Sequence, residues 1–286
     1  MNFITPMNFK TLKDKQEYYR SLTDYRLVPN SYVLVMLDGR SFSKKIKNKF
    51  HKPFDERFVN AMNETTKYLC EQIEGCKFGY CQSDEISLVL SDFETPHTDA
   101  FFSYRLSKIL SICASAATAK FNNEMMKASF REKITPYDSG FTIVDSIHEI
   151  TENAPLYEFD CKAWNVPTIN DVYGWFLHRQ LDCVRNSKSQ TAQAYLPHKE
   201  LVKLNSDEQI QKLKEVKGVD WNELDDGLKY GRFVYHVETK GVAPDGSEYT
   251  RNKFTIMPGR NLNSLEGKEI FYYHMQNPKI EITLTN

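Results

Sequence analysis

The chain has 286 residues, of which 41% are hydrophobic and 26% are charged, and its formal net charge is −1. Such a composition is ordinary for a globular protein and supplies enough apolar residues for a substantial core. It excludes a uniformly basic nucleic-acid coat protein. Any nucleic-acid partner must therefore be bound by local basic patches, such as the lysine-rich segment 44–52.

The six cysteines form no Cys-x-x-Cys pair, and their spacings match no zinc-site pattern. In a reducing compartment we expect free thiols, most of them buried. The sequence has no apolar run of membrane-spanning length, and its first twenty residues do not resemble a secretory signal. We therefore expect a cytoplasmic protein without a membrane partner.

The first expected elements are a short helix over 12–22 and a buried strand over 32–37. Six consecutive apolar residues, several of them β-branched, predict the strand. It ends at Asp38 and Gly39.

After the lysine-rich segment, Pro53 is well placed to begin an amphipathic helix over 54–73. Two short strands follow, over 77–81 and 86–90. The polar turn Gln82-Ser83-Asp84-Glu85 joins them into a hairpin.

A second long helix is expected over 99–122, followed by a looser region over 125–154. A fourth strand fits 156–163, and a third helix fits 169–190. The order strand, helix, strand, strand, helix, strand is that of the ferredoxin-like polymerase palm. The predicted fold class is therefore α+β, with a βαββαβ palm.

The last third of the chain predicts a mixed extension of helices and a β-hairpin. Ser206 with Gln209 resembles a capping box. Segments 233–239 and 249–257 could pair around Pro244-Asp245-Gly246. We expect a catalytic domain over 1–191 and an extension over 192–286 that packs on it.

Two acidic segments meet in this topology. In a split βαβ sheet the third strand is the antiparallel neighbour of the first, so the end of the first lies beside the start of the third. Those ends carry Asp38 and Asp84-Glu85. For either aspartate alone, a turn residue at a strand end is the more ordinary interpretation. Their expected proximity favours a shared catalytic site.

Neighbouring carboxylates resist joint ionisation, and a divalent cation relieves their repulsion. Magnesium prefers one or two carboxylates together with water and substrate phosphates. Asp38, Asp84 and the carbonyl oxygen of Gly39 are therefore candidate ligands for two Mg²⁺ ions, which would activate a hydroxyl and stabilise a leaving phosphate. The substrate stays open at this point, because nucleotide cyclases of the diguanylate type also carry acidic hairpin turns.

Short motifs, taken in order, resemble the tRNA-His guanylyltransferase family over roughly residues 10 to 235. The motifs are Leu37-Asp38-Gly39-Arg40-Ser41-Phe42, Phe50-His51-Lys52-Pro53-Phe54-Asp55-Glu56-Arg57, Gln82-Ser83-Asp84-Glu85-Ile86-Ser87 and Arg105-Leu106-Ser107-Lys108. The resemblance implies an enzyme that adds nucleotides to the 5′ end of a tRNA. ATP would activate a 5′-monophosphate by adenylylation, and the 3′-hydroxyl of a nucleoside triphosphate such as GTP would then attack it. Members of the family are similar in forming homotetramers.

The resemblance also implies roles for individual residues. Asp38, Gly39 and Asp84 would ligate the two metal ions, and Glu85 would support the site, so Asp38, Asp84 and Glu85 are the predicted catalytic residues. The predicted nucleotide contacts are Gly39, Arg40, Ser41, Phe42, Ser43, Lys52, Ser83, Arg105 and Lys108. Without the other motifs, Arg105 and Lys108 would be interpreted as an exposed helix face.

The sequence departs from the eukaryotic members of the family at two places. Segment 183–189 stands where they carry a His-Ile-Asn-Asn-Leu-Tyr-Asn motif, which argues against non-templated addition of guanylate to tRNA-His. Met36 stands where they carry arginine, so one triphosphate contact is expected to be missing or replaced. Segments 159–164 and 179–187 resemble the bacterial and archaeal members, which tend to repair truncated tRNA 5′ ends on a template. The predicted tRNA contacts are Arg179, Arg185, Asn186 and Lys188.

We therefore expect a template-dependent, 3′-to-5′ nucleotide-adding enzyme. The alternatives are non-templated guanylate addition to tRNA-His, a nucleotide cyclase, and a non-catalytic RNA-binding protein that has kept the fold.

Overall fold

A six-stranded antiparallel sheet in the order β4-β1-β3-β2-β5-β6 organises the chain. The computed structural model describes residues 9–46, 49–95, 97–133, 147, 152, 154–242 and 246–276. The strands are β1 (Tyr32–Gly39), β2 (Cys76–Gln82), β3 (Glu85–Leu90), β4 (Phe159–Val166), β5 (Arg232–Val242) and β6 (Glu248–Pro258). The α-helices are α1 (Leu12–Ser21), α2 (Phe42–Ile46), α3 (Glu56–Gln72), α4 (Leu106–Lys133), α6 (Ile169–Tyr195), α7 (His198–Leu201), α8 (Ser206–Lys217), α9 (Asp226–Lys229) and α10 (Leu265–Gln276).

The first four strands form the predicted palm. β3 lies between β1 and β2 and is antiparallel to both, while β4 pairs with the free edge of β1. The β1–β3 register runs from Val33 opposite Leu90 to Asp38 opposite Glu85. This arrangement confirms the α+β, palm-like fold class.

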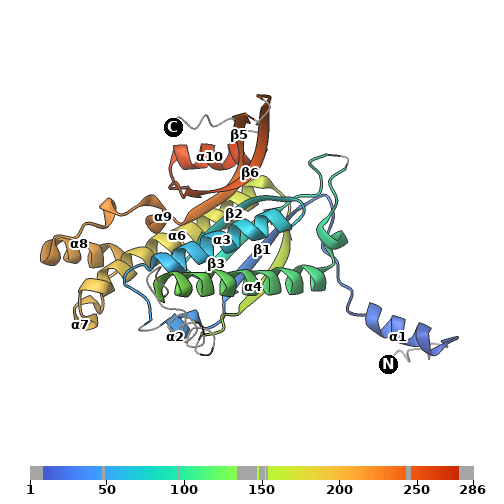
Figure 1. Ribbon diagram of the computed structural model, residues 1–286, viewed down its shortest axis with the longest axis horizontal. Coiled ribbons are helices and arrows are strands. Elements are labelled where there is room, and N and C mark those ends of the chain that lie inside the picture. The colour runs from blue at the N-terminus through green and yellow to red at the C-terminus, as the bar shows by residue number, and fades with distance from the viewer. Residues whose placement is uncertain are drawn as a thin grey trace.

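Helices cover both faces of the sheet (Figure 1). Side chains alternate along a strand, so β1 contributes to two cores. Val33, Val35 and Leu37 pack in the core that contains residues of α3 and α4. Leu34 packs on the opposite face, with Phe176 of α6 and Phe271 of α10.

The second long helix differs from its predicted bounds. A 3-10 turn over Phe101–Tyr104 precedes α4, with Phe102 and Ser103 at positive φ, so the α-helix begins only at Leu106. At its other end α4 continues to Lys133, and the expected loose region 125–154 is wrong for residues 125–133. Buried Met125 and ion pairs from Glu124 to Lys120 and Lys127 stabilise these added turns.

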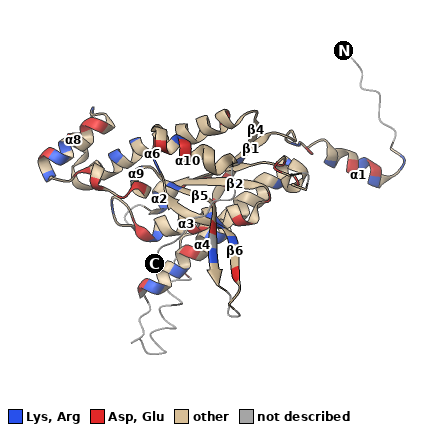
Figure 2. Cartoon of the chain, turned by 90° about the horizontal axis from the view of Figure 1, so that it is seen from above, with Lys and Arg blue, Asp and Glu red and all other residues tan. Residues whose placement is uncertain are grey.

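The N-cap of α8 also differs from the prediction, because it lies one residue earlier in the chain. Asn205, not Ser206, accepts the main-chain N–H groups of Asp207 and Glu208, and Glu208 completes the capping box in place of Gln209. Acidic and basic residues both occur along this helix and along α1 (Figure 2).

The C-terminal hairpin is confirmed as β5 and β6, although Pro244 and Asp245 of its expected turn lie outside the described residues. β5 pairs with β2, so the hairpin extends the palm sheet. The predicted division at residue 191 stays a prediction; α6 runs past it to Tyr195.

α1 stands apart from the sheet and its covering helices (Figure 1), and none of its residues is buried. In the part of the chain that the structure describes, no helix is long and apolar enough to cross a bilayer. All six cysteines are free thiols, and only Cys161 is not fully buried.

Candidate active site

Asp38 and Asp84 meet at one end of the sheet, as the topology predicted. The main-chain N–H of Gly39 donates a hydrogen bond of 3.0 Å to the carbonyl oxygen of Asp84. On the neighbouring strands, Asp38 lies opposite both Glu85 and Asp160. Four acidic residues, three from strands and Asp84 from the β2–β3 turn, therefore gather where β1 ends.

The electrostatics of this end of the sheet disfavour negative charge. Burial raises the pKa of Asp38, and the carboxylates of Asp84 and Asp160 raise it further. Burial also raises the pKa of Asp84, although the Ser83 hydroxyl donates a hydrogen bond of 3.1 Å to it. No described lysine or arginine forms an ion pair with Asp38 or Asp84.

These two carboxylates fit a divalent cation, because such an ion would relieve the cost of burying them charged. Among the residues described, no three His, Cys, Asp or Glu side chains converge into a metal-binding group. A cation would therefore bind to Asp38 and Asp84 together with oxygen atoms of the main chain, water and substrate phosphates.

Gly39 is required here by close packing. A Cβ atom at this position would lie 2.7 Å from the ring of Phe42. Phe42 is 1% exposed and packs against the rings of Phe58, Phe121 and Phe159. The Phe42 side chain therefore belongs to the core, and its predicted contact with a nucleotide stays a prediction.

The rest of the segment after β1 is polar and exposed. Arg40 lies 3.6 Å from the carboxylate of Glu158, and Lys45 lies 3.4 Å from the same group. Ser41 has a φ of 58°, which turns the chain into α2. Ser43 is exposed and faces a cavity.

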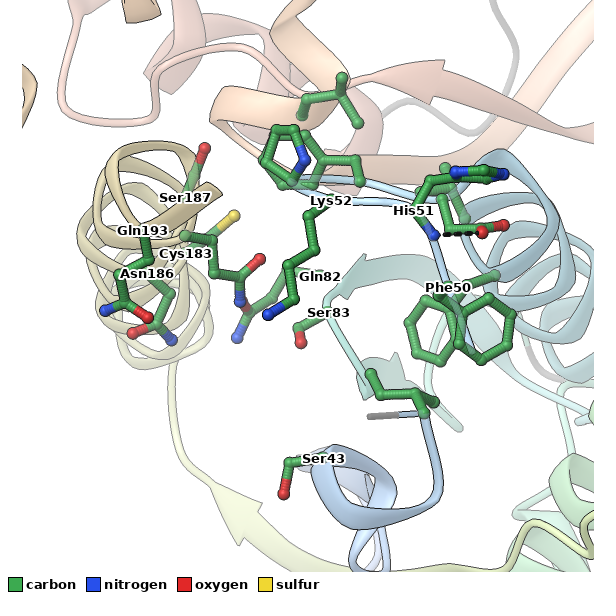
Figure 3. Close-up of a pocket in the computed structure, with 18 of the residues that line it drawn as sticks. Ser43, Phe50, His51, Lys52, Gln82, Ser83, Cys183, Asn186, Ser187 and Gln193 are labelled. Atoms are coloured by element: carbon green, nitrogen blue, oxygen red, sulfur yellow. Dashed lines mark hydrogen bonds between the residues drawn. The ribbon is translucent and has the colours of Figure 1, made fainter. Parts of the chain in front are cut away.

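That cavity has a volume of about 300 Å³ and lies between α2, α6 and the β2–β3 turn. Lys52 points into it toward Gln82 and Ser83, and Asn186 and Gln193 of α6 line its other side (Figure 3). The predicted site residues Ser43, Lys52, Ser83 and Asn186 are thus brought together. The space suits one small ligand, and aromatic and amide side chains in its wall suit a nucleobase.

The wall that carries Lys52 is held by Asp55. This carboxylate caps α3 and accepts hydrogen bonds from the main-chain N–H of His51 (2.9 Å) and from Arg57 (2.7 Å). Arg57 also donates to the carbonyl oxygen of Lys49 and pairs with Glu132 of α4. Burial alone would raise the pKa of Asp55, but these hydrogen bonds lower it overall.

Glu85 and Arg179 are bound to each other. Nε and Nη2 of Arg179 donate to Oε1 and Oε2 of Glu85, each at 2.6 Å, and Nη1 lies 3.1 Å from Asp182. Sequence analysis assigned Glu85 to catalysis and Arg179 to tRNA, without connecting them.

The other predicted tRNA contacts separate into two kinds. Arg185 is 63% exposed, and its ion pair among the described residues is with Asp182 of its own helix. Lys188 is 17% exposed, pairs with Asp207 and lies 5.0 Å from the centre of the Trp221 ring. Arg185 is therefore accessible to a ligand, whereas Lys188 is held by contacts with Asp207 and Trp221 inside the protein.

Arg105 and Lys108 do not join the other candidates within this chain. Arg105 pairs with Asp24 at 2.6 Å and forms an isolated bridge with Arg26, just before β1 begins. Asp38 lies at the other end of β1. Their role in holding phosphate stays a prediction.

Sequence analysis assigned no role to Asp160 or Lys162. The pairing of β4 with β1 places Asp160 opposite Asp38 and Lys162 opposite Met36, on the same face. Lys162 lowers the pKa of Asp38, against the larger effect of burial. Alternating polar residues in the predicted fourth strand were the available signal, once that strand is placed beside the first.

Comparison with known proteins gives a consistent result. A family model described as tRNAHis guanylyltransferase matches residues 14–167. An uncharacterised protein of Acanthamoeba polyphaga mimivirus is 27% identical over 82% of this chain and 80% of that protein. The tRNA(His) guanylyltransferase of Neurospora crassa is 28% identical over 58% of this chain, a match that spans 49% of the fungal protein.

Solved structures agree at the level of the whole fold. A bacterial tRNA(His) guanylyltransferase (Thg1)-like protein in complex with ATP has a TM-score of 0.74 at 29% identity, covering 93% of this chain and 99% of that chain. Its complex with GTP has a TM-score of 0.69 at 28% identity, covering 93% and 98%. The Saccharomyces cerevisiae enzyme, at 20% identity, shares the fold with a TM-score of 0.58 over 82% of this chain and 94% of that chain.

Proposed function

The chain belongs to the tRNAHis guanylyltransferase family, and we propose that it adds nucleotides in the 3′-to-5′ direction to the 5′ end of a tRNA. The observation that carries this proposal is the meeting of Asp38 and Asp84 next to Ser83, which lines the cavity together with Lys52. Nucleotidyl transfer needs such an acidic site next to a place for a triphosphate.

ATP and GTP are the proposed nucleotide substrates. The bacterial relatives of similar fold were solved with ATP and with GTP. In support, Lys52, Asn186 and Gln193 line the cavity of this chain. We propose that the ammonium group of Lys52 binds phosphate and that the two amides hydrogen-bond to a base.

In the proposed first step, an oxygen of the tRNA 5′-monophosphate attacks the α-phosphorus of ATP, and pyrophosphate leaves. The 3′-hydroxyl of the incoming triphosphate then attacks the adenylylated 5′ phosphorus, and AMP leaves. The protein supplies position and charge and forms no covalent intermediate. Asp38, the carbonyl oxygen of Gly39 and Asp84 would hold the Mg²⁺ ions, which supply Lewis-acid stabilisation of the phosphates when bound.

We propose that addition follows a template and serves 5′-end repair. Support comes from the α6 sequence Arg185-Asn186-Ser187, which differs from the eukaryotic motif and whose Asn186 and Ser187 line the cavity. Guanylate addition to tRNA-His is the second candidate, since relatives that carry that name are similar to this chain. A homotetramer is proposed on family resemblance alone, and a cytoplasmic location is proposed from the sequence analysis alone.

The test uses a tRNA transcript that lacks its 5′ nucleotide. Asp38→Ala and Asp84→Ala should each abolish nucleotide addition while the thermal unfolding transition is kept. Full activity in either folded variant would reject the site. Relative rates on truncated and complete tRNA-His transcripts separate repair from guanylate addition.

Two controls separate the other classes of function. A nucleotide cyclase would form a cyclic product from triphosphate without RNA. A non-catalytic RNA-binding protein would bind tRNA without Mg²⁺ and release no pyrophosphate.

A further inference from the structure

We infer that Glu85 and Arg179 form a positioning pair, in which Glu85 neutralises a guanidinium that would otherwise occupy the cation site at Asp38. Neither residue then acts directly: Glu85 is not a metal ligand, and Arg179 does not bind tRNA phosphate. This inference rests on the proposed function, because it assumes that Asp38 and Asp84 bind a divalent cation.

The geometry of the pair leaves little of either side chain for another partner. Both carboxylate oxygens of Glu85 accept hydrogen bonds from Arg179, at 2.6 Å each. The two side chains are only 7% and 14% exposed. A bidentate, largely buried pair of this kind is costly to separate.

Arg179 is also fixed from two further directions. Its Nη1 lies 3.1 Å from Asp182, one turn along α6, and its guanidinium carbon lies 5.7 Å from the centre of the Trp175 ring. Trp175 is itself bound to β3 by a hydrogen bond of 3.2 Å from Nε1 to Ser87 Oγ. Reaching out to an RNA phosphate would break these contacts.

The position of Glu85 explains why the pair matters for the cation site. Glu85 lies opposite Asp38 in the β1–β3 register, so Arg179 is close to Asp38 as well. If Glu85 alone became neutral, Nη1 of Arg179 would stay on Asp182, but Nε and Nη2 would lose their acceptors beside Asp38. The unbalanced guanidinium would then be drawn to Asp38 and would compete there with a divalent cation. If Arg179 alone became neutral, Glu85 would add negative charge beside Asp38 and would not weaken cation binding.

These opposite signs give a double-mutant cycle in which Mn²⁺ binding is read from the free-ion electron paramagnetic resonance signal. We expect Glu85→Gln to weaken Mn²⁺ binding about tenfold, while Arg179→Met leaves it equal or tighter. The double variant should return to within about threefold of the unmutated protein, because the competing charge is gone. A double variant as weak as Glu85→Gln would show that Glu85 is itself a ligand.

Asp38→Asn is the reference for the metal site. It should lose Mn²⁺ binding whatever residues occupy 85 and 179. Unchanged binding in Asp38→Asn would overturn the proposed cation site, which is a different failure from that of the pair. Equal weakening in Glu85→Gln and Arg179→Met would reduce the pair to a structural contact and overturn the inference.

The second readout is tRNA affinity as a function of salt. Arg179→Met should keep the slope of log affinity against log salt concentration, because no phosphate contact is lost. A slope reduced by about one would identify a direct contact and overturn this part of the inference. If the single variants unfold, the double variant still decides the ligand question, since it leaves no buried charge unpaired.

Discussion

The carboxylate of Asp55 and the carboxylates of Asp38 and Asp84 differ in how the protein balances their charge. Asp55 is buried, accepts hydrogen bonds from His51 and Arg57, and has a lowered pKa. Asp38 and Asp84 are partly buried without a cation of their own, and their pKa values are raised. Donors of the chain itself balance the charge of Asp55, which supports the cavity wall. Asp38 and Asp84 have no such ion pair among the described residues and would be balanced by a bound cation.

The largest expected effect follows from removing one of the unpaired acids. Asp38→Asn should lower the rate of nucleotide addition by roughly three orders of magnitude, because the site then lacks a carboxylate that would hold the cation against the substrate phosphates. The metal-free variant should unfold at a higher temperature than the unmodified protein, since a repelled charge is gone. A stability loss comparable to that of Asp55→Asn would contradict the contrast between the two sites.

The opposite pattern is expected for the paired acid. Asp55→Asn should lower the free energy of unfolding by about 3 kcal/mol at neutral pH, because Arg57 loses its buried partner. A lowered folded-state pKa means that this contribution is complete above the ordinary value of 3.8 and is lost as the pH falls below it. Chemical denaturation at several pH values should show the two proteins converging in acid.

Glu56→Gln is a matched control for Asp55→Asn. It removes an exposed acid from the same first turn of α3, where only the helix dipole is affected. A loss of a few tenths of a kcal/mol is expected. A loss as large as that of Asp55→Asn would mean that the helix end, not the Arg57 pair, accounts for the effect.

A smaller effect is expected at the wall that Asp55 supports. Lys52→Ala should raise the KM for ATP about tenfold with little change in stability, because one charge-assisted hydrogen bond to phosphate is lost. Steady-state kinetics on a 5′-monophosphorylated, truncated tRNA would measure it. An unchanged KM would remove Lys52 from the nucleotide site.

The smallest effect is expected on α6. Arg185→Gln should reduce the salt dependence of tRNA affinity by about one unit of slope, since its exposed guanidinium is available to phosphate. Lys188→Gln is the matched control and should leave the slope unchanged, because Lys188 pairs with Asp207 beside Trp221. Filter binding over a range of salt concentrations distinguishes the two.

The meeting of Asp38 and Asp84 could be predicted from the sequence because it depends on connectivity alone. Once the order of elements indicates a palm, the end of β1 must lie beside the start of β3. The same argument shows why Arg105 and Lys108 lie elsewhere: β3 runs away from Asp84, so the helix that follows it starts at the far end of the sheet.

The Glu85–Arg179 pair could not be predicted from the order of the elements. The two residues are 94 positions apart, and their meeting depends on how far α6 is rotated over the sheet, which Trp175 and Ser87 help to set. The extension of α4 over residues 125–133 could not be predicted for a similar reason. The local hydrophobic periodicity of this segment is weak, and the burial of Met125 and Phe121 in the core stabilises it as a helix.

The pairing of β5 with β2 has a consequence for anyone who seeks a minimal catalytic fragment. A chain cut before residue 232 would keep every acid of the site but would strip β2 of its outer neighbour. The main-chain N–H and C=O groups of Phe78 to Cys81 would then lie on an unpaired edge strand, and such edges pair with strands of other molecules. The hairpin thus covers the edge of the sheet that carries the acidic residues, and we expect the truncated protein to aggregate before its activity could be assayed.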